Sequence, residues 1–266
     1  MKVGIINGVY KEEGYDHLKT LKLAAGIIDP FYRVDVVQIY LNSQDLENTA
    51  LLKLIAERVE EYRIELISHI HGIPRGEELK RALFGHSLIL RGQKIKRAVI
   101  HFDESLTSQS VEAFNEVGID VYVENIHKGI TAEELAKHDD FVEFVLRVSQ
   151  GYNIGAVLDF GRYFVGETEN KTMDIIGKIL ETCKRLMEKN VPVFFHTVGS
   201  RNFDQKREDW VSPGCREDKL PQKKILEGIV ALSAATAEPL IIESEKVAHA
   251  IEGVKFFKAL MQELNG

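Results

Sequence analysis

The feature that most constrains the fold is a regular alternation of short apolar runs with amphipathic segments. Eight runs rich in β-branched and aromatic residues recur along the chain, and each gap between them carries a segment with helical periodicity. Such alternation predicts parallel strands, which are buried on both faces and are therefore almost continuously apolar. The expected strands are Val3 to Val9, Val34 to Tyr40, Ile64 to Ile70, Arg97 to Phe102, Ile119 to Val123, Ile154 to Leu158, Pro192 to His196 and Pro239 to Ile242.

The number of strands and the length of the chain together predict how the sheet closes. Eight strand-helix units in about 250 residues are typical of a (β/α)8 TIM barrel, and this chain has 266 residues. A doubly wound open sheet is the alternative that shares the same local pattern. No linker rich in Pro, Gly or Ser and no break in composition divides the sequence, so we predict one domain over residues 1–266.

Composition and charge narrow the class of protein. Hydrophobic residues make up 44% and charged residues 28%, which is typical of a folded globular chain. The formal net charge of −7 disfavours a nucleic-acid partner, although an acidic protein can still carry a local basic cleft. Only Cys183 and Cys215 are present, so a disulfide-stapled secreted scaffold is not indicated, and we expect a cytoplasmic location. We expect no signal peptide and no membrane span.

The polar residues that end the expected strands are mostly of metal-ligand type. In a TIM barrel the active site lies at these ends. Taken singly, each side chain can be interpreted as a helix cap or a loop contact. In six consecutive strands they would bring several carboxylates together, and these would repel one another without a cation. The residues are His69 and His71, His101, Glu124, Asp159, His196 and Glu243.

Four of these residues form an oxygen-rich set with one nitrogen: Glu124, Asp159, His196 and Glu243. Such a set suits Mn²⁺, Mg²⁺, Co²⁺ or Zn²⁺, whereas a structural zinc site normally uses thiolates. We therefore predict a divalent metal cofactor. No P-loop, dinucleotide-binding glycine fingerprint or nucleophile elbow is present, so no further cofactor site is indicated.

Short motifs at the strand ends resemble the xylose isomerase-like barrel superfamily, which includes sugar and sugar-phosphate isomerases and epimerases and the endonuclease-IV-type apurinic endonucleases. The resemblance extends over essentially the whole chain, and His69-Ile70-His71 and Ile100-His101-Phe102 match more weakly. The stronger matches are Val123-Glu124-Asn125, like L-E-N, Leu158-Asp159-Phe160-Gly161, like L-D-x-G, Phe195-His196, like the family's I-H, and Ile241-Ile242-Glu243, like the closing I-x-E.

The resemblance implies roles for individual residues. A metal would be bound by the four-residue set, and Glu124 and Glu243 would also act as catalytic acid and base on opposite faces of the substrate carbon. Removal of a proton beside a carbonyl gives an enediolate, which a divalent metal stabilises. His71 and His101 would orient the substrate or, in a multinuclear site, bind additional metal.

Three departures from the family pattern bear on the reaction. Arg162 stands where L-D-x-G-H has its histidine, and Gly199 stands where H-x-x-D has its aspartate; the aspartate-histidine pair of the following loop is also missing. Since arginine has no lone pair for a metal, a three-zinc nuclease site would be damaged. Arg162, helped by Arg201, is suited to grip a phosphate or carboxylate, or else forms a salt bridge at the rim. Trp210 would stack on a sugar or pack its loop down.

These observations favour a metal-dependent sugar or sugar-phosphate isomerase or epimerase with a small-molecule substrate. The alternatives are an apurinic endonuclease or phosphodiesterase, and a barrel that binds a sugar without turning it over. Phe141-Phe144 and Phe256-Phe257 indicate either contact in a homo-oligomer or packing in the core. The remaining histidines are expected outside the strand-end layer, at the surface or on helices; they are His17, His86, His127, His138 and His249.

Overall fold

The eight expected strands form a closed parallel barrel, so the predicted (β/α)8 TIM barrel is confirmed. The computed structural model describes residues 1–27, 33–232 and 238–265. Around the barrel, each strand pairs with its two neighbours, and β1 closes the ring by pairing with both β2 and β10. The strands are β1 Val3–Ile6, β2 Val36–Tyr40, β3 Glu65–His69, β4 Arg97–His101, β5 Asp120–Glu124, β6 Ile154–Asp159, β7 Val193–Thr197 and β10 Leu240–Ile242.

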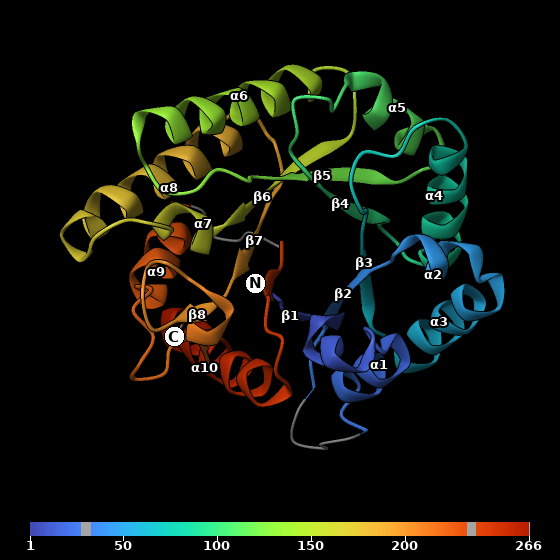
Figure 1. Ribbon diagram of the computed structural model, residues 1–266, viewed down its shortest axis with the longest axis horizontal. Coiled ribbons are helices and arrows are strands. Elements are labelled where there is room, and N and C mark those ends of the chain that lie inside the picture. Colours follow the sequence, from blue (N-terminus) through green and yellow to red (C-terminus); the bar gives the residue numbers. More distant parts are fainter. Residues whose placement is uncertain (28–32, 233–237, 266) are drawn as a thin grey trace.

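Helices surround the barrel and connect its strands (Figure 1). The long outer helices bury one face each, as α8 does with Ile175, Ile179 and Cys183, and pack against the outward side chains of the strands. The helices are α1 His17–Ala24, α2 Ser43–Glu47, α3 Thr49–Tyr62, α4 Gly76–Ile89, α5 Ser108–Glu116, α6 Ala132–Val148, α7 Phe160–Phe164, α8 Thr172–Met187, α9 Gln222–Leu232 and α10 Val247–Asn265, with short 3-10 helices η1 Asn7–Glu13, η2 Glu169–Lys171 and η3 Arg207–Asp209.

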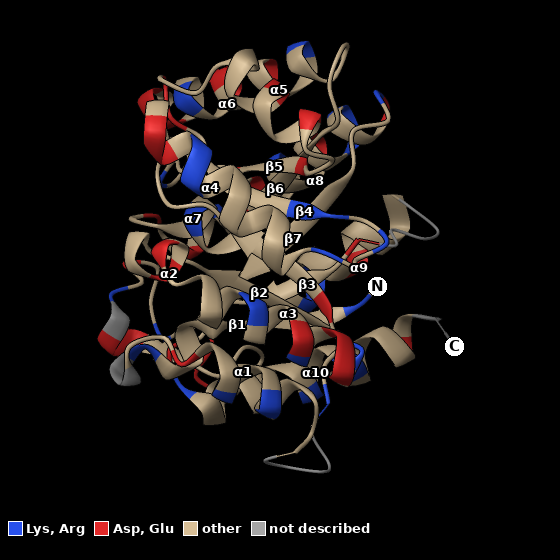
Figure 2. Ribbon diagram, turned by 90° about the vertical axis from the view of Figure 1, so that its right-hand side faces the viewer, with Lys and Arg blue, Asp and Glu red and all other residues tan. Residues whose placement is uncertain are grey.

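Local capping explains where several helices begin. Asn48 accepts a hydrogen bond from the Leu51 N–H and starts α3, and Thr131 accepts one from the Glu134 N–H and starts α6. The Glu134 carboxylate accepts from the Lys128 N–H, 2.5 Å away, so it binds the approaching loop. In Figure 2, the acidic and basic residues lie mostly on the helices and loops, and few of them lie on the strands.

The barrel interior is filled by one apolar layer. Alternate residues of a strand point to opposite faces, and the inward positions at mid-strand meet in a separate buried cluster inside the ring. Gly155 belongs to this packing, because a Cβ there would lie 2.4 Å from the Tyr122 ring. The members of the cluster are Val36, Ile67, Val99, Tyr122, Val157, Phe194 and Ile241.

Several expectations about individual side chains need correction. His17, His86 and His138 lie on helices, as expected, but they are buried, and His127 is buried in a loop, so a surface position is wrong for all four; each has a polar or aromatic neighbour that the sequence pattern does not reveal. Phe141, Phe144 and Phe257 pack in the core between helices and barrel, which accounts for them without a subunit contact. Within the described ranges, no helix has the length and apolar character needed to span a bilayer.

The long connection after β7 is folded onto the barrel. Its two short strands, β8 Gly199–Ser200 and β9 Trp210–Val211, pair antiparallel. A Cβ at position 199 would lie 2.6 Å from the Val211 carbonyl oxygen, so only glycine allows this approach of the two backbone segments. The close packing gives a structural reason for Gly199 at the position where the resembling family has aspartate.

Candidate active site

The polar residues of the site form the layer directly above the apolar layer of the barrel. Each lies two residues after an apolar interior residue on the same strand or just beyond it, so its side chain also points inward. The pairs are Val36 and Gln38, Ile67 and His69, Val99 and His101, Tyr122 and Glu124, Val157 and Asp159, Phe194 and His196, and Ile241 and Glu243. The seven polar side chains therefore meet at the carboxyl end of the barrel.

Glu124, His196 and Glu243 converge at the centre of this layer. His196 Nδ1 lies 3.2 Å from Glu124 Oε2 and 3.1 Å from Glu243 Oε1. Glu124 and His196 are almost completely buried, whereas a quarter of the Glu243 side chain is exposed. The three potential ligand atoms all lie within 4.8 Å of one another. The sequence-predicted acid-base pair and the predicted imidazole ligand are thus adjacent.

The contacts around His196 Nδ1 leave lone pairs without hydrogen-bond partners. Gln38 Oε1 lies 2.9 Å from His196 Nε2, so an Nε2–H donates to this amide oxygen and the neutral ring keeps its lone pair on Nδ1. In the described part of the chain, His196 Nδ1 and both carboxylate oxygens of Glu124 lack a hydrogen-bond partner. With His196 neutral, its Nδ1 lone pair, Glu124 Oε2 and Glu243 Oε1 therefore lie around a common point, an arrangement that a cation satisfies.

The spacing of these atoms fits a divalent metal. Neighbouring ligands on an octahedral ion with bonds of about 2.1 Å lie roughly 3 Å apart, close to the separations between Nδ1 and the two carboxylate oxygens. A proton on Nδ1 is the other way to satisfy the group. Glu124, His196 and Glu243 are therefore the residues that would hold a metal at this position.

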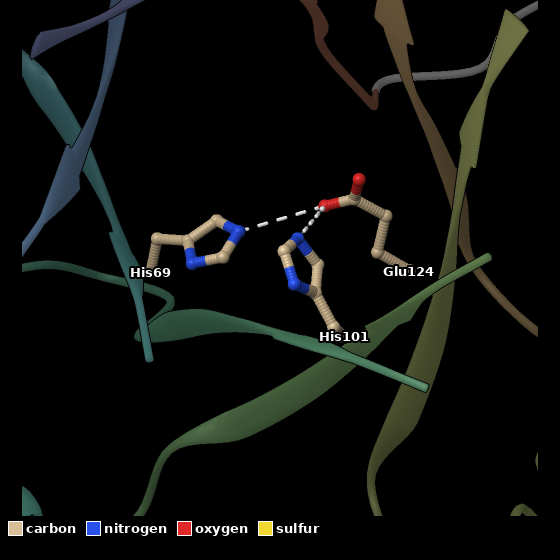
Figure 3. Close-up of side chains that lie close together, drawn as sticks. All are labelled: His69, His101 and Glu124. Atoms are coloured by element: carbon tan, nitrogen blue, oxygen red, sulfur yellow. Dashed lines mark ion pairs between the residues drawn. The ribbon is translucent and has the colours of Figure 1, made fainter. Parts of the chain in front are cut away.

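A second group of potential ligands shares Glu124. His69 Nε2 and His101 Nε2 each lie 3.5 Å from Glu124 Oε2, and both rings turn toward that oxygen (Figure 3). The two rings also contact each other edge to face, with their centroids 4.9 Å apart. Because both groups contain Glu124 Oε2, this single oxygen connects two neighbouring positions for a cation.

Asp159 differs from the other predicted ligands. Its Oδ1 accepts a hydrogen bond from the Gly161 N–H and so caps α7, and its Oδ2 lies 3.2 Å from Arg162 Nε. The Arg162 guanidinium also approaches Glu124, with Nη2 3.7 Å from Oε1. Among the described residues, the groups of ligands close enough to share one ion do not contain Asp159. Three of the four predicted metal ligands are therefore brought together, and the fourth is paired with arginine.

The charges of the layer are strongly coupled. Burial by itself would lower the pKa of His196, but Glu243 and Glu124 outweigh it and raise this pKa to about 10. Burial would conversely raise the pKa of Glu124 and of Glu243, and the positive charge of His196 brings both below their usual range. Burial raises the pKa of Asp159 to about 7 against the effect of Arg162. A proton on His196 thus occupies the position that suits a metal.

A cavity of about 240 Å³ opens above these residues. One wall is aromatic: Tyr15 contacts Tyr40, and Tyr40 contacts His69, with ring centroids 5.8 and 5.6 Å apart. The lining also contains charged groups, among them an ion pair between Lys11 and Glu245 that is 2.6 Å long. The cavity is lined by Ile6, Asn7, Gly8, Lys11, Tyr15, Gln38, Tyr40, His69, His101, Glu124, Arg162, Glu243 and Glu245.

The predicted substrate-binding residues divide between the cavity and its surroundings. His101 and Arg162 line it. His71 lies beyond the end of β3 and is hydrogen bonded to the Tyr40 hydroxyl outside the lining. Arg201 is exposed and pairs with Glu217 at 2.5 Å, and Trp210 donates its indole N–H to the Gln205 carbonyl, which is the loop-packing alternative for this side chain.

Two residues of the layer have no role in the predicted site: His69 is named only as a strand-end residue of metal-ligand type, and Gln38 is not named. The alternation along each strand holds the signal that identifies them, because both follow an interior apolar residue by two positions. His71 lies two positions after His69 and so belongs to the same inward-facing set. It lies past the last residue of β3, however, and therefore reaches the rim instead of the layer of Glu124. For Gln38 the signal is a polar residue in the middle of a strand, because the other residues of Val36–Tyr40 are apolar except for the final tyrosine.

The comparisons with known proteins identify the fold. No protein-family model and no curated protein sequence matches the chain. Among solved structures, a xylose isomerase domain protein from Alicyclobacillus acidocaldarius superimposes with a TM-score of 0.65 at 15% identity, covering 100% of both chains. A D-psicose 3-epimerase solved in the presence of D-fructose gives 0.62 at 15%, again with 100% of both chains.

A third similar structure has the same architecture with lower identity. It is a sugar phosphate isomerase/epimerase from Parabacteroides distasonis, with a TM-score of 0.62 at 11% identity over 97% of this chain and 93% of that one. The chain therefore shares its TIM-barrel fold with solved structures of the kind that its strand-end motifs resemble.

Proposed function

We propose that this protein is a metal-dependent sugar or sugar-phosphate isomerase or epimerase. The observation that carries the proposal is the convergence of Glu124 Oε2 and Glu243 Oε1 on His196 Nδ1, with buried lone pairs left unpaired at the mouth of the barrel. The similar structures include a D-psicose 3-epimerase and a sugar phosphate isomerase/epimerase, which supports a sugar as the substrate class.

Glu124 and Glu243 are the proposed acid-base pair. They come from β5 and from the end of β10, two strands that flank β6 and β7 in the barrel. Both carboxylates have a lowered pKa and can accept a proton from a carbon beside a carbonyl. The part-exposed Glu243 exchanges its proton with solvent, whereas Glu124 is shielded. A bound divalent metal would supply Lewis-acid stabilisation of the enediolate.

The cavity supports a small substrate. Its volume of about 240 Å³ lies below the roughly 300 Å³ at which pockets for drug-sized ligands begin. Tyr15 and Tyr40 offer apolar ring surface to the C–H face of a sugar, and Arg162 offers its guanidinium to hydroxyl or phosphate oxygens. His101, partly exposed at the rim, is the proposed orienting residue.

A second candidate function rests on the second group of ligands. His69, His101 and Glu124 would hold another ion next to the first, and two adjacent ions about 3.5–4 Å apart are typical of phosphoester hydrolases. The net charge of −7 and Arg162 at a family histidine position weigh against an apurinic nuclease. The number of bound ions separates the two functions.

The test combines metal content with proton exchange. The wild-type protein, Glu243→Gln and His196→Ala are analysed for Mn, Zn, Co and Fe, with Glu263→Gln and His249→Ala as matched controls outside the layer. D-fructose is then incubated with the Mn²⁺-loaded protein in D₂O and followed by NMR. We expect about one ion per chain, lost in both site variants, and an exchange rate that falls roughly 10²- to 10⁴-fold in Glu124→Gln.

Other outcomes would favour one of the alternative functions. Two ions per chain, no exchange with ketoses or their phosphates and cleavage of bis(p-nitrophenyl) phosphate would favour the hydrolase. Failure to bind any metal under loading conditions would contradict both enzymatic functions and leave the sugar-binding barrel.

A further inference from the structure

A second cavity lies outside the barrel, between α2, α4 and the loop that follows β3. Its volume is about 180 Å³, and apolar and polar residues contribute equally to its walls. It is separated from the candidate active site by a hydrogen-bonded pair, because His71 lines this cavity while its partner Tyr40 lines the other. The apolar lining consists of Leu41, Leu46, Ile70, Pro74 and Ala82, and the polar lining of Ser43, His71, Glu78, Arg81 and His86.

His86 is the unusual member of this lining. The residue is completely buried on α4, and its Nδ1 is hydrogen bonded to Ser68 Oγ, on the outward face of β3. Its Nε2 has no hydrogen-bond partner in the part of the chain that the structure describes. A buried ring nitrogen without a hydrogen-bond partner destabilises the fold. Because Nδ1 is turned to Ser68, Nε2 is the ring atom left for a molecule in the cavity.

The electrostatics of the cavity favour an uncharged occupant. Burial lowers the pKa of His86 to about 3, so the imidazole is neutral. Arg81, the cation in the lining, is paired with Glu47 at 2.6 Å, and Glu78 adds an acid, so an anion finds no free positive charge here. A hydroxyl group suits the site, because it can accept from an Nε2–H or donate to an Nε2 lone pair, whichever tautomer Ser68 selects.

The size of the cavity suits a single ring. A dry apolar cavity of about 150 Å³ is known to hold benzene, and this one is slightly larger, with half of its lining residues polar. We propose that the cavity between α2 and α4 is a binding site for a small, neutral, ring-sized molecule that carries a hydroxyl group, and that this group hydrogen bonds to His86 Nε2.

The site has a direct connection to the candidate active site. Ser68, which holds His86, directly precedes His69 on β3, and the two side chains point to opposite faces of the strand. An occupant also contacts His71, which holds the Tyr40 hydroxyl against the aromatic wall of the other cavity. The molecule bound at His86 would therefore support the position of His69 and Tyr40 from behind.

The test uses phenol and its isostere toluene on the full-length protein without added metal, so its result does not depend on the proposed reaction. Binding is followed by the shift in melting temperature and by the ¹⁵N signal of His86 Nε2. The variant Ser68→Ala/His86→Phe removes both hydrogen-bonding partners together, which keeps the core satisfied. Ala82→Leu fills the cavity from α4, and Phe84→Ala, at an exposed position of the same helix, is the control.

We expect phenol to raise the melting temperature and to move the His86 Nε2 signal. In the double variant the affinity for phenol should fall at least tenfold relative to that for toluene, a loss of one hydrogen bond. Ala82→Leu should abolish binding of both molecules, and Phe84→Ala should change neither. No response to phenol at about 10 mM, or an equal loss of both ligands in the double variant, would mean that the cavity holds water alone and would overturn the proposal.

Discussion

The two ends of the barrel differ in how their buried charged groups are hydrogen bonded. At the amino-terminal end, Arg97 donates from all three of its guanidinium nitrogens: to Glu65 at 2.5 Å, to Glu238 at 3.3 Å and to the Tyr122 hydroxyl at 3.3 Å. At the carboxyl-terminal end, Glu124 has three histidines and Arg162 within 3.7 Å, yet neither of its oxygens has a hydrogen-bond partner among the described residues.

The difference shows how one scaffold separates stability from function. Around Arg97, all three guanidinium nitrogens find acceptors inside the chain, and among the described members of the cluster only Glu238 Oε2 lacks a hydrogen-bond partner; the cluster joins β3, β4, β5 and the segment before β10. Around Glu124, lone pairs of several groups face a common point, and the cluster is complete only with a cation or a proton. The amino-terminal end therefore contributes to the stability of the fold, whereas the carboxyl-terminal end has groups left to coordinate a ligand.

The largest expected effect breaks the amino-terminal cluster. Arg97→Ala leaves Glu65 and Glu238 without their buried cation and should lower the free energy of unfolding by about 3 kcal/mol in urea denaturation. Lys2→Ala removes a more exposed partner of Glu65 and should cost less than about 1 kcal/mol. A loss of stability in Glu124→Gln as large as that in Arg97→Ala would contradict the division between the two ends.

A smaller effect, on metal affinity, is expected from Gln38, whose amide contacts His196. Gln38→Leu removes the amide oxygen that accepts from Nε2–H, so the ring loses the contact that keeps its lone pair on Nδ1. The affinity for Mn²⁺ measured by calorimetry should fall roughly 10- to 100-fold. Gln93→Leu is the matched control, because Gln93 accepts from the Leu66 N–H at the other end of the barrel. Unchanged affinity in Gln38→Leu would exclude a role in orienting His196.

The smallest predicted effect is the release of a proton when the carboxyl-terminal cluster binds a metal. Since the pKa of His196 is raised to about 10 in the metal-free protein, Nδ1 carries a proton at neutral pH that a metal must displace. Metal binding should release about one proton, and the apparent affinity should rise roughly tenfold per pH unit up to that pKa. Calorimetry in two buffers of different ionisation enthalpy measures the release.

The sign of the linked stability change can also be checked. A raised pKa in the folded state stabilises the metal-free protein fully below the unfolded-state value of about 6.5, and this contribution is lost as the pH rises toward 10. His196→Ala should remove both the proton release and this pH dependence. Proton release that persists in the variant would assign it to another group.

The sequence was informative wherever a periodic pattern carried the information. The eight apolar runs and the helical segments between them predicted a closed parallel barrel, because strands buried on both faces must be apolar throughout. The same period of two locates the layer of polar residues above the interior cluster. Glu124, His196 and Glu243 could be proposed from their strand ends, and His69 and Gln38 were available from the same alternation.

What the tertiary structure decided depends on contacts between segments far apart in the chain. The approach of Arg162 to Glu124, the hydrogen bond from His196 to Gln38 and the burial of His86 against Ser68 follow from packing that no local pattern encodes. The sequence by itself determined which faces of the strands are apolar and which residue types end them. Only the fold decided which of those lone pairs remain unpaired, because that depends on the distances between side chains brought together from different strands.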